Sequence, residues 1–283
     1  MVSDRHTPEV AIVTDSTADI PQDFCSQYDV HVIPNIIIFE GTSLEDEVDI
    51  SRQEFYERLV TQKTLPTTAT ASSGAYQHKY GTLLEAGYQH ILSFHPPSHL
   101  SGIYNAAWVA SQEYPEKVTV IDSMQLTMAQ GFQVMAAAEA ARDGAAWQEV
   151  MMRVEDVRQH VRLVAMLDTL EYVRRSGRVS WARARIGELL RIKPFIEVKD
   201  GQIMSLGESR TYKKGLSRLK SMLLGLGPLE KLAILHTNAE EQARRFLTEL
   251  PEPLPENPFL VNVTSVIGTH VGPNGIGFAV VLS

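Results

Sequence analysis

Short apolar segments alternate with longer amphipathic segments along the first half of the chain. Apolar, β-branched runs predict strands at Val10–Thr14, Val30–Phe39, His90–Phe94 and Val118–Ile121. Apolar residues spaced three and four positions apart predict helices at Ile50–Val60, Ser73–Ala86, Ser101–Glu113 and Thr127–Arg142. Because strands that alternate with helices form helix-covered parallel sheets, we expect an N-terminal α/β domain whose mostly parallel sheet has helices on both faces.

The second half has a less regular pattern. Predicted strands lie at Leu163–Leu167, Ile192–Val198, Gln202–Leu206, Leu232–Leu235, Phe259–Thr264 and Ile276–Leu282, and predicted helices at Ala182–Leu190, Tyr212–Leu224 and Glu240–Leu250. Asp200-Gly201 suits the tight turn of a hairpin. We therefore expect a C-terminal α/β domain with a mixed sheet, and we predict domains at residues 1–158 and 159–283.

Length and composition narrow the class of protein. The chain has 283 residues, 44% of them hydrophobic and 21% charged, which suits two globular domains. Its one cysteine, Cys25, excludes an intrachain disulfide and a Cys-rich zinc site. The longest apolar runs are far shorter than the roughly 20 residues that span a bilayer, and the N-terminus lacks the apolar core of a signal peptide. We expect a cytoplasmic protein without a membrane span.

Charge is unevenly distributed. The net charge of −8 argues against a general nucleic-acid binder, since phosphate neutralisation needs a basic surface. Residues 174–220, however, contain 13 Lys and Arg against 4 Asp and Glu, a net of +9. This basic segment is either a docking face for an acidic partner or a phosphate, or a pair of helices with solvated faces.

Common catalytic motifs are missing from the sequence. It contains no Walker A loop, no Gly-x-Gly-x-x-Gly after a strand, no His-Glu-x-x-His and no Gly-x-Ser-x-Gly. The nine histidines do not pair with acids at the spacing of metal ligands. We expect no catalytic residue, no metal and no cofactor. The missing motifs favour a binding function over an enzymatic one.

Small hydroxyl and glycine clusters follow several predicted strands. Ser101 and Gly102 fall at the start of a helix, where free N–H groups and the helix dipole favour an anionic oxygen; alternatively, Ser101 only caps its own helix. His270 lies in a glycine-rich turn between apolar strands, where a ligand can approach closely. Asp15 and Ser16, at the end of the first strand, provide either a site acid or a helix cap.

Taken together, these segments resemble the DegV family, which includes the fatty-acid-binding FakB subunits of bacterial fatty acid kinase. The order and spacing of five segments carry the resemblance from Val10 to the C-terminus. These segments are Val13–Pro21, Thr68–Ser72, Leu100–Tyr104, Leu170–Ser180 and Ile267–Pro273.

The resemblance implies a two-domain α/β protein that holds one long-chain fatty acid, such as palmitate (hexadecanoate), between or within its domains. The positions that meet the carboxylate in the family fall on Thr68 and Ser101, with Gly102 and His270 as further members. The first segment reads Thr-Ala-Thr-Ala-Ser, so Thr70 is a candidate to share the role of Thr68. Asp15 and Ser16 are further candidate ligands.

The resemblance also implies presentation without catalysis. The lipid-loaded protein would dock on a separate fatty acid kinase that forms the acyl phosphate, with Arg178 and Arg210 facing the kinase and transient contact with a membrane. One alternative is an acyl hydrolase that uses Ser101, His270 and Asp15. A second alternative, a DNA-binding regulator that uses the basic segment, fits poorly with the acidic composition.

Overall fold

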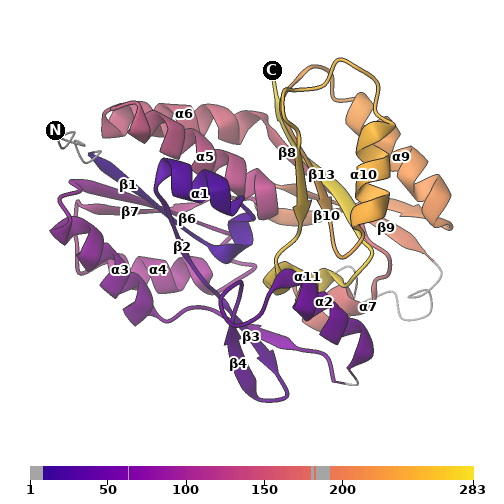
Figure 1. Ribbon diagram of the computed structural model, residues 1–283, viewed down its shortest axis with the longest axis horizontal. Helices are drawn as coiled ribbons and strands as arrows, with labels where there is room; N and C mark the ends of the chain where they lie inside the picture. The colour runs from indigo at the N-terminus through magenta and orange to yellow at the C-terminus, as the bar shows by residue number, and fades with distance from the viewer. Residues whose placement is uncertain (1–8, 63, 180–181, 183–191) are drawn as a thin grey trace.

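The computed structural model describes residues 9–62, 64–179, 182 and 192–283 (Figure 1). The first half of the chain builds a four-stranded sheet in which every neighbouring pair is parallel, in the order β2-β1-β6-β7. Its strands are β1 (Val10–Asp15), β2 (Val30–Ile33), β6 (His90–His95) and β7 (Val118–Asp122). The predicted parallel sheet is thereby confirmed.

Helices cover both faces of this sheet, as predicted. One face packs against α5 (Thr127–Arg142) and α6 (Trp147–His160), with α1 (Gln22–Tyr28) beside them. The other face packs against α3 (Ser73–Glu85) and α4 (Ile103–Ser111). Side-chain alternation along β1 explains the two layers, because Ile12 faces α5 while Ala11 and Val13 face α3 and α4.

The second half builds a six-stranded mixed sheet, in the order β10-β9-β8-β13-β11-β12, in which only β11 and β12 are parallel neighbours. The strands are β8 (Val161–Met166), β9 (Lys193–Lys199), β10 (Gln202–Ser209), β11 (Leu229–His236), β12 (Phe259–Asn262) and β13 (Ile276–Leu282). Asp200 and Gly201 both have positive φ at the β9–β10 turn, as the hairpin prediction requires. Helices α9 (Tyr212–Leu224) and α10 (Glu240–Thr248) cover one face.

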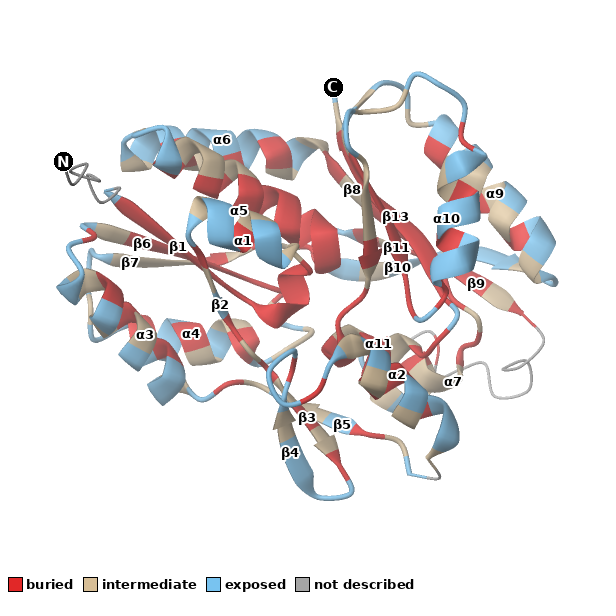
Figure 2. Cartoon of the chain, viewed as in Figure 1, coloured by how far each residue is buried: buried red, intermediate tan, exposed pale blue. Residues whose placement is uncertain are grey.

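Helix α5 belongs to both halves of the molecule. Phe132 and Met135 pack on the inner face of the mixed sheet, whereas Val134 and Ala138 pack on the parallel sheet. Figure 2 shows the helix buried along most of its length. A helix that is apolar around its whole circumference is typical of such a position between two layers. The predicted boundary at residue 158 lies two residues before the end of α6, and the division into domains there stays a prediction.

A third, small antiparallel sheet was not predicted. It consists of β3 (Ile36–Phe39), β4 (Thr42–Glu45) and β5 (Thr67–Ala69), in the order β4-β3-β5. Helix α2 (Arg52–Thr61) packs on it through Phe55, Tyr56 and Leu59. This unit lies next to α7 (Glu171–Ser176) and α11 (Ser265–Val271), below the two large sheets in Figure 1.

Two predictions about elements were wrong. The run Val30–Phe39 is not one strand but divides into β2 and β3, because Pro34 lacks an N–H and the buried Asn35 donates to Asp15 at 3.0 Å. His270 does not lie in a glycine-rich turn but in the last turn of α11. The predicted helix Ala182–Leu190 falls almost wholly outside the described residues. Within the described ranges, no helix combines the length and the hydropathy that crossing a membrane requires.

Candidate functional site

Helix α11 brings His270 to a position beside β5. Thr264 caps the helix by accepting the N–H of Val266 at 3.4 Å, and the helix ends at Gly272, where φ is +80°. At the other end of the chain, β5 pairs with β3 and fixes Thr68 opposite Ile37. The Oγ1 atom of Thr68 and the Nε2 atom of His270 are 3.1 Å apart, although 202 residues separate them in sequence.

These two side chains line a cavity of about 150 Å³, which we call the mixed cavity. Its polar wall comes from five separate segments and consists of Thr17, Thr68, Thr70, Ser101, Arg178 and His270. Gly102 also lines it, and a Cβ at that position would lie 3.5 Å from the Thr70 methyl group. The structure thus brings together Thr68, Thr70, Ser101, Gly102 and His270 from the predicted set.

The mixed cavity adjoins a second, apolar cavity of about 80 Å³. Four residues line both of them: Leu126, Ile203, Ile267 and Val271. Beyond these, the wall of the apolar cavity comes from the strands of the mixed sheet, for example Leu163 and Ile196. A cavity with several polar groups in its wall therefore lies directly against a wholly apolar one.

On its other side, the mixed cavity adjoins an outer cavity of about 290 Å³. Thr68, Arg178 and His270 line both, and the side chain of Arg175, half exposed, lines the outer cavity. The three cavities form a series from the arginines at the surface to the apolar interior. Arg210 lies apart from this series, exposed between β10 and α9.

His270 is neutral at pH 7. Burial, together with the positive charge of Arg178, lowers the pKa of its imidazole to about 4. A neutral imidazole has one N–H donor and one acceptor nitrogen, so the ring and the Thr68 hydroxyl together offer a donor to a third group. A carboxylate accepts such donors, and it would also attract the nearby guanidinium of Arg178.

Ser101 lies directly before Gly102, the cap residue of α4. Its Oγ atom accepts the N–H of Ile103, the first residue of α4, at 3.3 Å, as expected for a helix cap. The same residue lines the mixed cavity. Because a hydroxyl accepts and donates at once, Ser101 can hold the helix start and still donate to a ligand oxygen.

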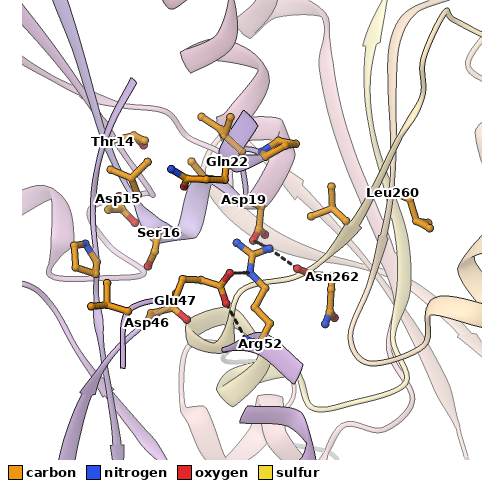
Figure 3. Close-up of a pocket in the computed structure, with 17 residues that line it drawn as sticks. Thr14, Asp15, Ser16, Asp19, Gln22, Asp46, Glu47, Arg52, Leu260 and Asn262 are labelled. Atoms are coloured by element: carbon orange, nitrogen blue, oxygen red, sulfur yellow. Dashed lines mark hydrogen bonds and ion pairs between the residues drawn. The ribbon is translucent and has the colours of Figure 1, made fainter. Parts of the chain in front are cut away.

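Asp15 and Ser16 lie at a different cavity, a polar cleft of about 390 Å³ (Figure 3). Asp15 is fully buried and accepts from Thr17 at 2.6 Å and from Asn35 at 3.0 Å. Of this segment, Thr17 lines the mixed cavity instead. The placement of Asp15 and Ser16 does not match a role as direct ligands in the mixed cavity, because their bonds anchor η1 (Ser16–Ala18) and Asn35.

The residues named for a hydrolase do not form a catalytic triad. Such a triad needs a carboxylate on the second nitrogen of the histidine and the serine on the first. In the part of the chain that the structure describes, the imidazole of His270 bonds only to Thr68, and the carboxylate of Asp15 bonds to His95 at 2.8 Å. Ser101 and His270 share a cavity without a hydrogen bond between them.

A Ser-His-Asp line does exist elsewhere, but it is closed. The Nε2 atom of His95 lies 2.7 Å from Ser93 Oγ, and its Nδ1 atom lies 2.8 Å from Asp15. All three side chains are fully buried, and the Tyr80 hydroxyl donates to Ser93 at 2.8 Å. Without access for a substrate, this line serves as an internal hydrogen-bond network that joins β1, β6 and α3.

Sequence reasoning missed the apolar lining and Thr17. Ile203, Ile267 and Val271 carried no local signal, because their role depends on strands and helices that meet only in the folded chain. Among the described residues, no group of three or more His, Cys, Asp or Glu side chains is placed to hold a metal.

Comparison with known proteins identifies the fold and the family. The sequence model described as "Uncharacterised protein, DegV family" matches residues 9–283. Protein DegV of Bacillus subtilis (strain 168) is 33% identical over 275 residues, which cover 95% of this chain and 97% of that protein. A DegV domain-containing protein of Staphylococcus aureus (strain N315) is 31% identical, with the same coverage of both chains.

Solved structures resemble this one over nearly the full length. The DegV fatty-acid-binding protein of Bacillus subtilis superposes with a TM-score of 0.87 at 31% identity, covering 98% of this chain and 100% of that chain. A DegV family protein of Thermus thermophilus, described as binding fatty acid, gives 0.87 at 28% identity, covering 97% and 100%. A stearic-acid-binding protein of Eubacterium ventriosum gives 0.85 at 26% identity, covering 96% and 98%. The chain belongs to the DegV family.

Proposed function

We propose that this protein binds one long-chain fatty acid, with the carboxylate in the mixed cavity and the hydrocarbon chain in the apolar cavity. The observation that carries the proposal is that the two cavities adjoin, with Leu126, Ile203, Ile267 and Val271 in the walls of both. A fatty acid has the matching arrangement, a polar head group joined to an apolar tail. The fatty acids bound by three structural relatives support the same ligand class.

The tail supplies most of the affinity. Each buried methylene contributes roughly 0.8 kcal/mol, so a 16-carbon chain contributes on the order of 10 kcal/mol before ordering costs. Hydrogen bonds from Thr68 and Ser101 add about 0.5–1.5 kcal/mol each and fix the direction of the chain. His270, Thr70 and the backbone at Gly102 complete the head site.

The head site is tested by comparing two ligands with the same tail. Palmitate and hexadecanol differ only in the head group, so their affinity ratio isolates the carboxylate contacts. We expect Thr68→Ala and Ser101→Ala each to weaken palmitate binding by about threefold to tenfold and to leave hexadecanol binding nearly unchanged. Equal losses for both ligands in calorimetric titrations would mean that these hydroxyls do not hold the carboxylate.

We further propose that the protein is a carrier and not an enzyme, and that it presents the carboxylate to a separate cytoplasmic kinase. Arg175 and Arg178 border the outer cavity, the described opening nearest to the head site. The net charge of +9 over residues 174–220 suits an acidic or phosphate-bearing partner. Charge reversal at Arg178 and Arg210 should abolish acyl phosphate formation with a bacterial fatty acid kinase, and charge reversal at Arg210 alone, which lies outside the three cavities, should lower it while palmitate binding persists. Unchanged phosphorylation would contradict the docking role.

A further inference from the structure

The segment that leads into α11 is held by charged side chains from the other end of the chain. Figure 3 shows the Arg52 guanidinium between Asp19 and Asn262. The Nη1 atom of Arg52 lies 2.9 Å from Asp19 Oδ1 and also donates to the carbonyl of Asn262. The same Asp19 oxygen accepts the N–H of Thr264 at 2.8 Å. One carboxylate thereby joins η1, α2 and the start of α11.

Two further side chains complete this anchor. The Tyr56 hydroxyl donates to the carbonyl of Val263 at 3.0 Å, and the Thr264 hydroxyl donates to the carboxylate of Asp46. Consequently, each of the three consecutive residues from Asn262 to Thr264 is bound by a side chain from the first 56 residues. We call Asp19, Asp46, Arg52 and Tyr56 the α11 anchor.

The anchor and the proposed head site lie at opposite ends of one short helix. From Thr264 to His270 there are six residues, or about 9 Å of helical rise. The helix also packs closely on α2, since a Cβ at Gly268 would come within 2.5 Å of the Tyr56 hydroxyl. A shift of the anchored end therefore moves the imidazole relative to Thr68 on β5.

We propose that Asp19, acting with Arg52, is a positioning residue that sets α11 so that His270 meets the Thr68 hydroxyl and a ligand carboxylate. This inference rests on the proposed function and deepens it. Asp19 does not line the mixed cavity, so its effect on binding passes through the helix.

Stability alone does not explain an ionisable group at this position. Asp19 is fully buried at its side chain, and in the described residues its Oδ2 atom has no hydrogen-bond partner. Burial raises the pKa of its carboxyl to about 6 against the lowering effect of Arg52. Asp46 and Thr127 also affect the pKa of the Asp19 carboxyl, and Asp19 in turn affects the pKa of the Tyr56 hydroxyl. An asparagine would accept the same N–H with a smaller desolvation cost, but it would not hold the guanidinium by charge.

A double-mutant cycle on palmitate affinity tests the proposal. The single variants are Asp19→Asn and His270→Ala, each measured by calorimetric titration of the delipidated full chain. We expect Asp19→Asn to weaken palmitate binding about tenfold in the wild-type background, as expected when one hydrogen bond to a carboxylate is misaligned. In the His270→Ala background, the same substitution should change the affinity by less than about twofold.

Controls separate positioning from general loosening. Asp143→Asn removes an exposed carboxylate at the far end of α5 and should leave the affinity unchanged. Urea unfolding at pH 7 should show that Asp19→Asn unfolds in one cooperative transition, as the wild type does, so that its affinity is that of a folded protein. If the variant does not fold, Tyr56→Phe acts on the same anchor with its ring retained, and it enters the same cycle with His270→Ala.

The possible results are distinct. If the Asp19 effect persists at full size without His270, or if Asp19→Asn binds palmitate like the wild type, the positioning role is overturned while the proposed function stands. If the wild-type protein itself binds no palmitate, the proposed function fails and this inference falls with it. Loss of the Asp19 effect in the His270→Ala background supports the inference.

Discussion

Two ionisable side chains near the proposed site are pushed toward their neutral forms by the same cause. Burial lowers the pKa of the His270 imidazole to about 4 and raises the pKa of the Asp19 carboxyl to about 6. The imidazole is thus neutral throughout the physiological range, whereas the carboxylate is ionised at pH 7 at the expense of stability. Both shifts make the free energy of unfolding depend on pH, in opposite directions, so only a comparison of the wild type with an Asp19 variant isolates the contribution of Asp19.

Replacing Asp19 should change the pH dependence of stability. The folded pKa of about 6 exceeds the ordinary value of 3.8, so the folded state binds the proton more tightly. The stability contributed by the protonated carboxyl is complete below about pH 4 and is lost as the pH rises through 6. Asp19→Asn removes this dependence. Relative to the wild type, the free energy of unfolding of the variant should therefore rise by on the order of 3 kcal/mol between pH 4 and pH 7.

Urea denaturation of both proteins at several pH values between 4 and 8 measures this difference. Contributions from titrating groups that do not interact with Asp19 cancel when the variant is compared with the wild type. Parallel curves for the two proteins would show that Asp19 has the same pKa in the folded and unfolded states.

At the residue scale, local patterns predicted the hydroxyls and the histidine but not their supports. Thr68, Ser101 and His270 stand in short segments with recognisable composition. The partners of Asp19 are 33 and 245 residues away, so no local pattern connects Arg52 and Thr264 with it. Long-range polar contacts of this kind follow from topology and not from neighbouring residues.

Among the elements, α11 shows how packing overrides local propensity. Two valines and a glycine within seven residues disfavour a helix, and the sequence predicted a turn there. The Thr264 cap and the anchored carbonyls hold the segment helical, and Gly268 allows α2 to approach it. The strand and helix predictions succeeded best where periodicity was long, as at Tyr212–Leu224, whose bounds the structure reproduces.

Gly268→Ala should damage the element that carries His270. The added methyl would lie 2.5 Å from the Tyr56 hydroxyl and 3.0 Å from the Phe55 ring, so α11 or α2 must move. We expect a loss of about 1–3 kcal/mol in the free energy of unfolding, together with weaker palmitate binding.

Gly74→Ala is the matched control for that substitution. Gly74 lies in the first turn of α3, and a methyl there would be 3.7 Å from the Ser72 hydroxyl, which is ordinary contact. It should stabilise the protein by about 0.5–1 kcal/mol and leave palmitate binding unchanged. If Gly268→Ala were equally harmless in unfolding and binding measurements, the close packing of α11 would not matter for the site.

For the whole molecule, the cavities exist because two layers of different origin meet. The inner face of the mixed sheet supplies the apolar wall, while η1, β5, the start of α4, α11 and the segment after α7 supply the polar wall. Sequence periodicity predicted both large sheets and most of the helices on them, but not α1 or α6. It did not predict how the sheets share α5, and the apolar lining depends on that arrangement.

Filling the apolar cavity should select against long chains. Ala165 lines that cavity from β8, and Ala165→Leu adds three carbons to its wall. We expect palmitate affinity to fall at least tenfold and decanoate affinity to fall less, with a loss of about 1–3 kcal/mol in unfolding free energy. Ala75→Leu, on the exposed side of α3, is the control.

Calorimetric titration with the two fatty acids measures the effect. An equal loss for both chain lengths would place the tail elsewhere. An unchanged affinity for palmitate would also place the tail elsewhere, because the leucine side chain would then displace no part of the bound fatty acid.

The measurement that tests the central claim most directly is native mass spectrometry of the protein purified from a bacterial host, followed by solvent extraction and identification of any released lipid. The account predicts a mass excess of one long-chain fatty acid, which is lost in the Thr68→Ala/Ser101→Ala double variant. A protein that carries no lipid and also fails to take up added palmitate would contradict it.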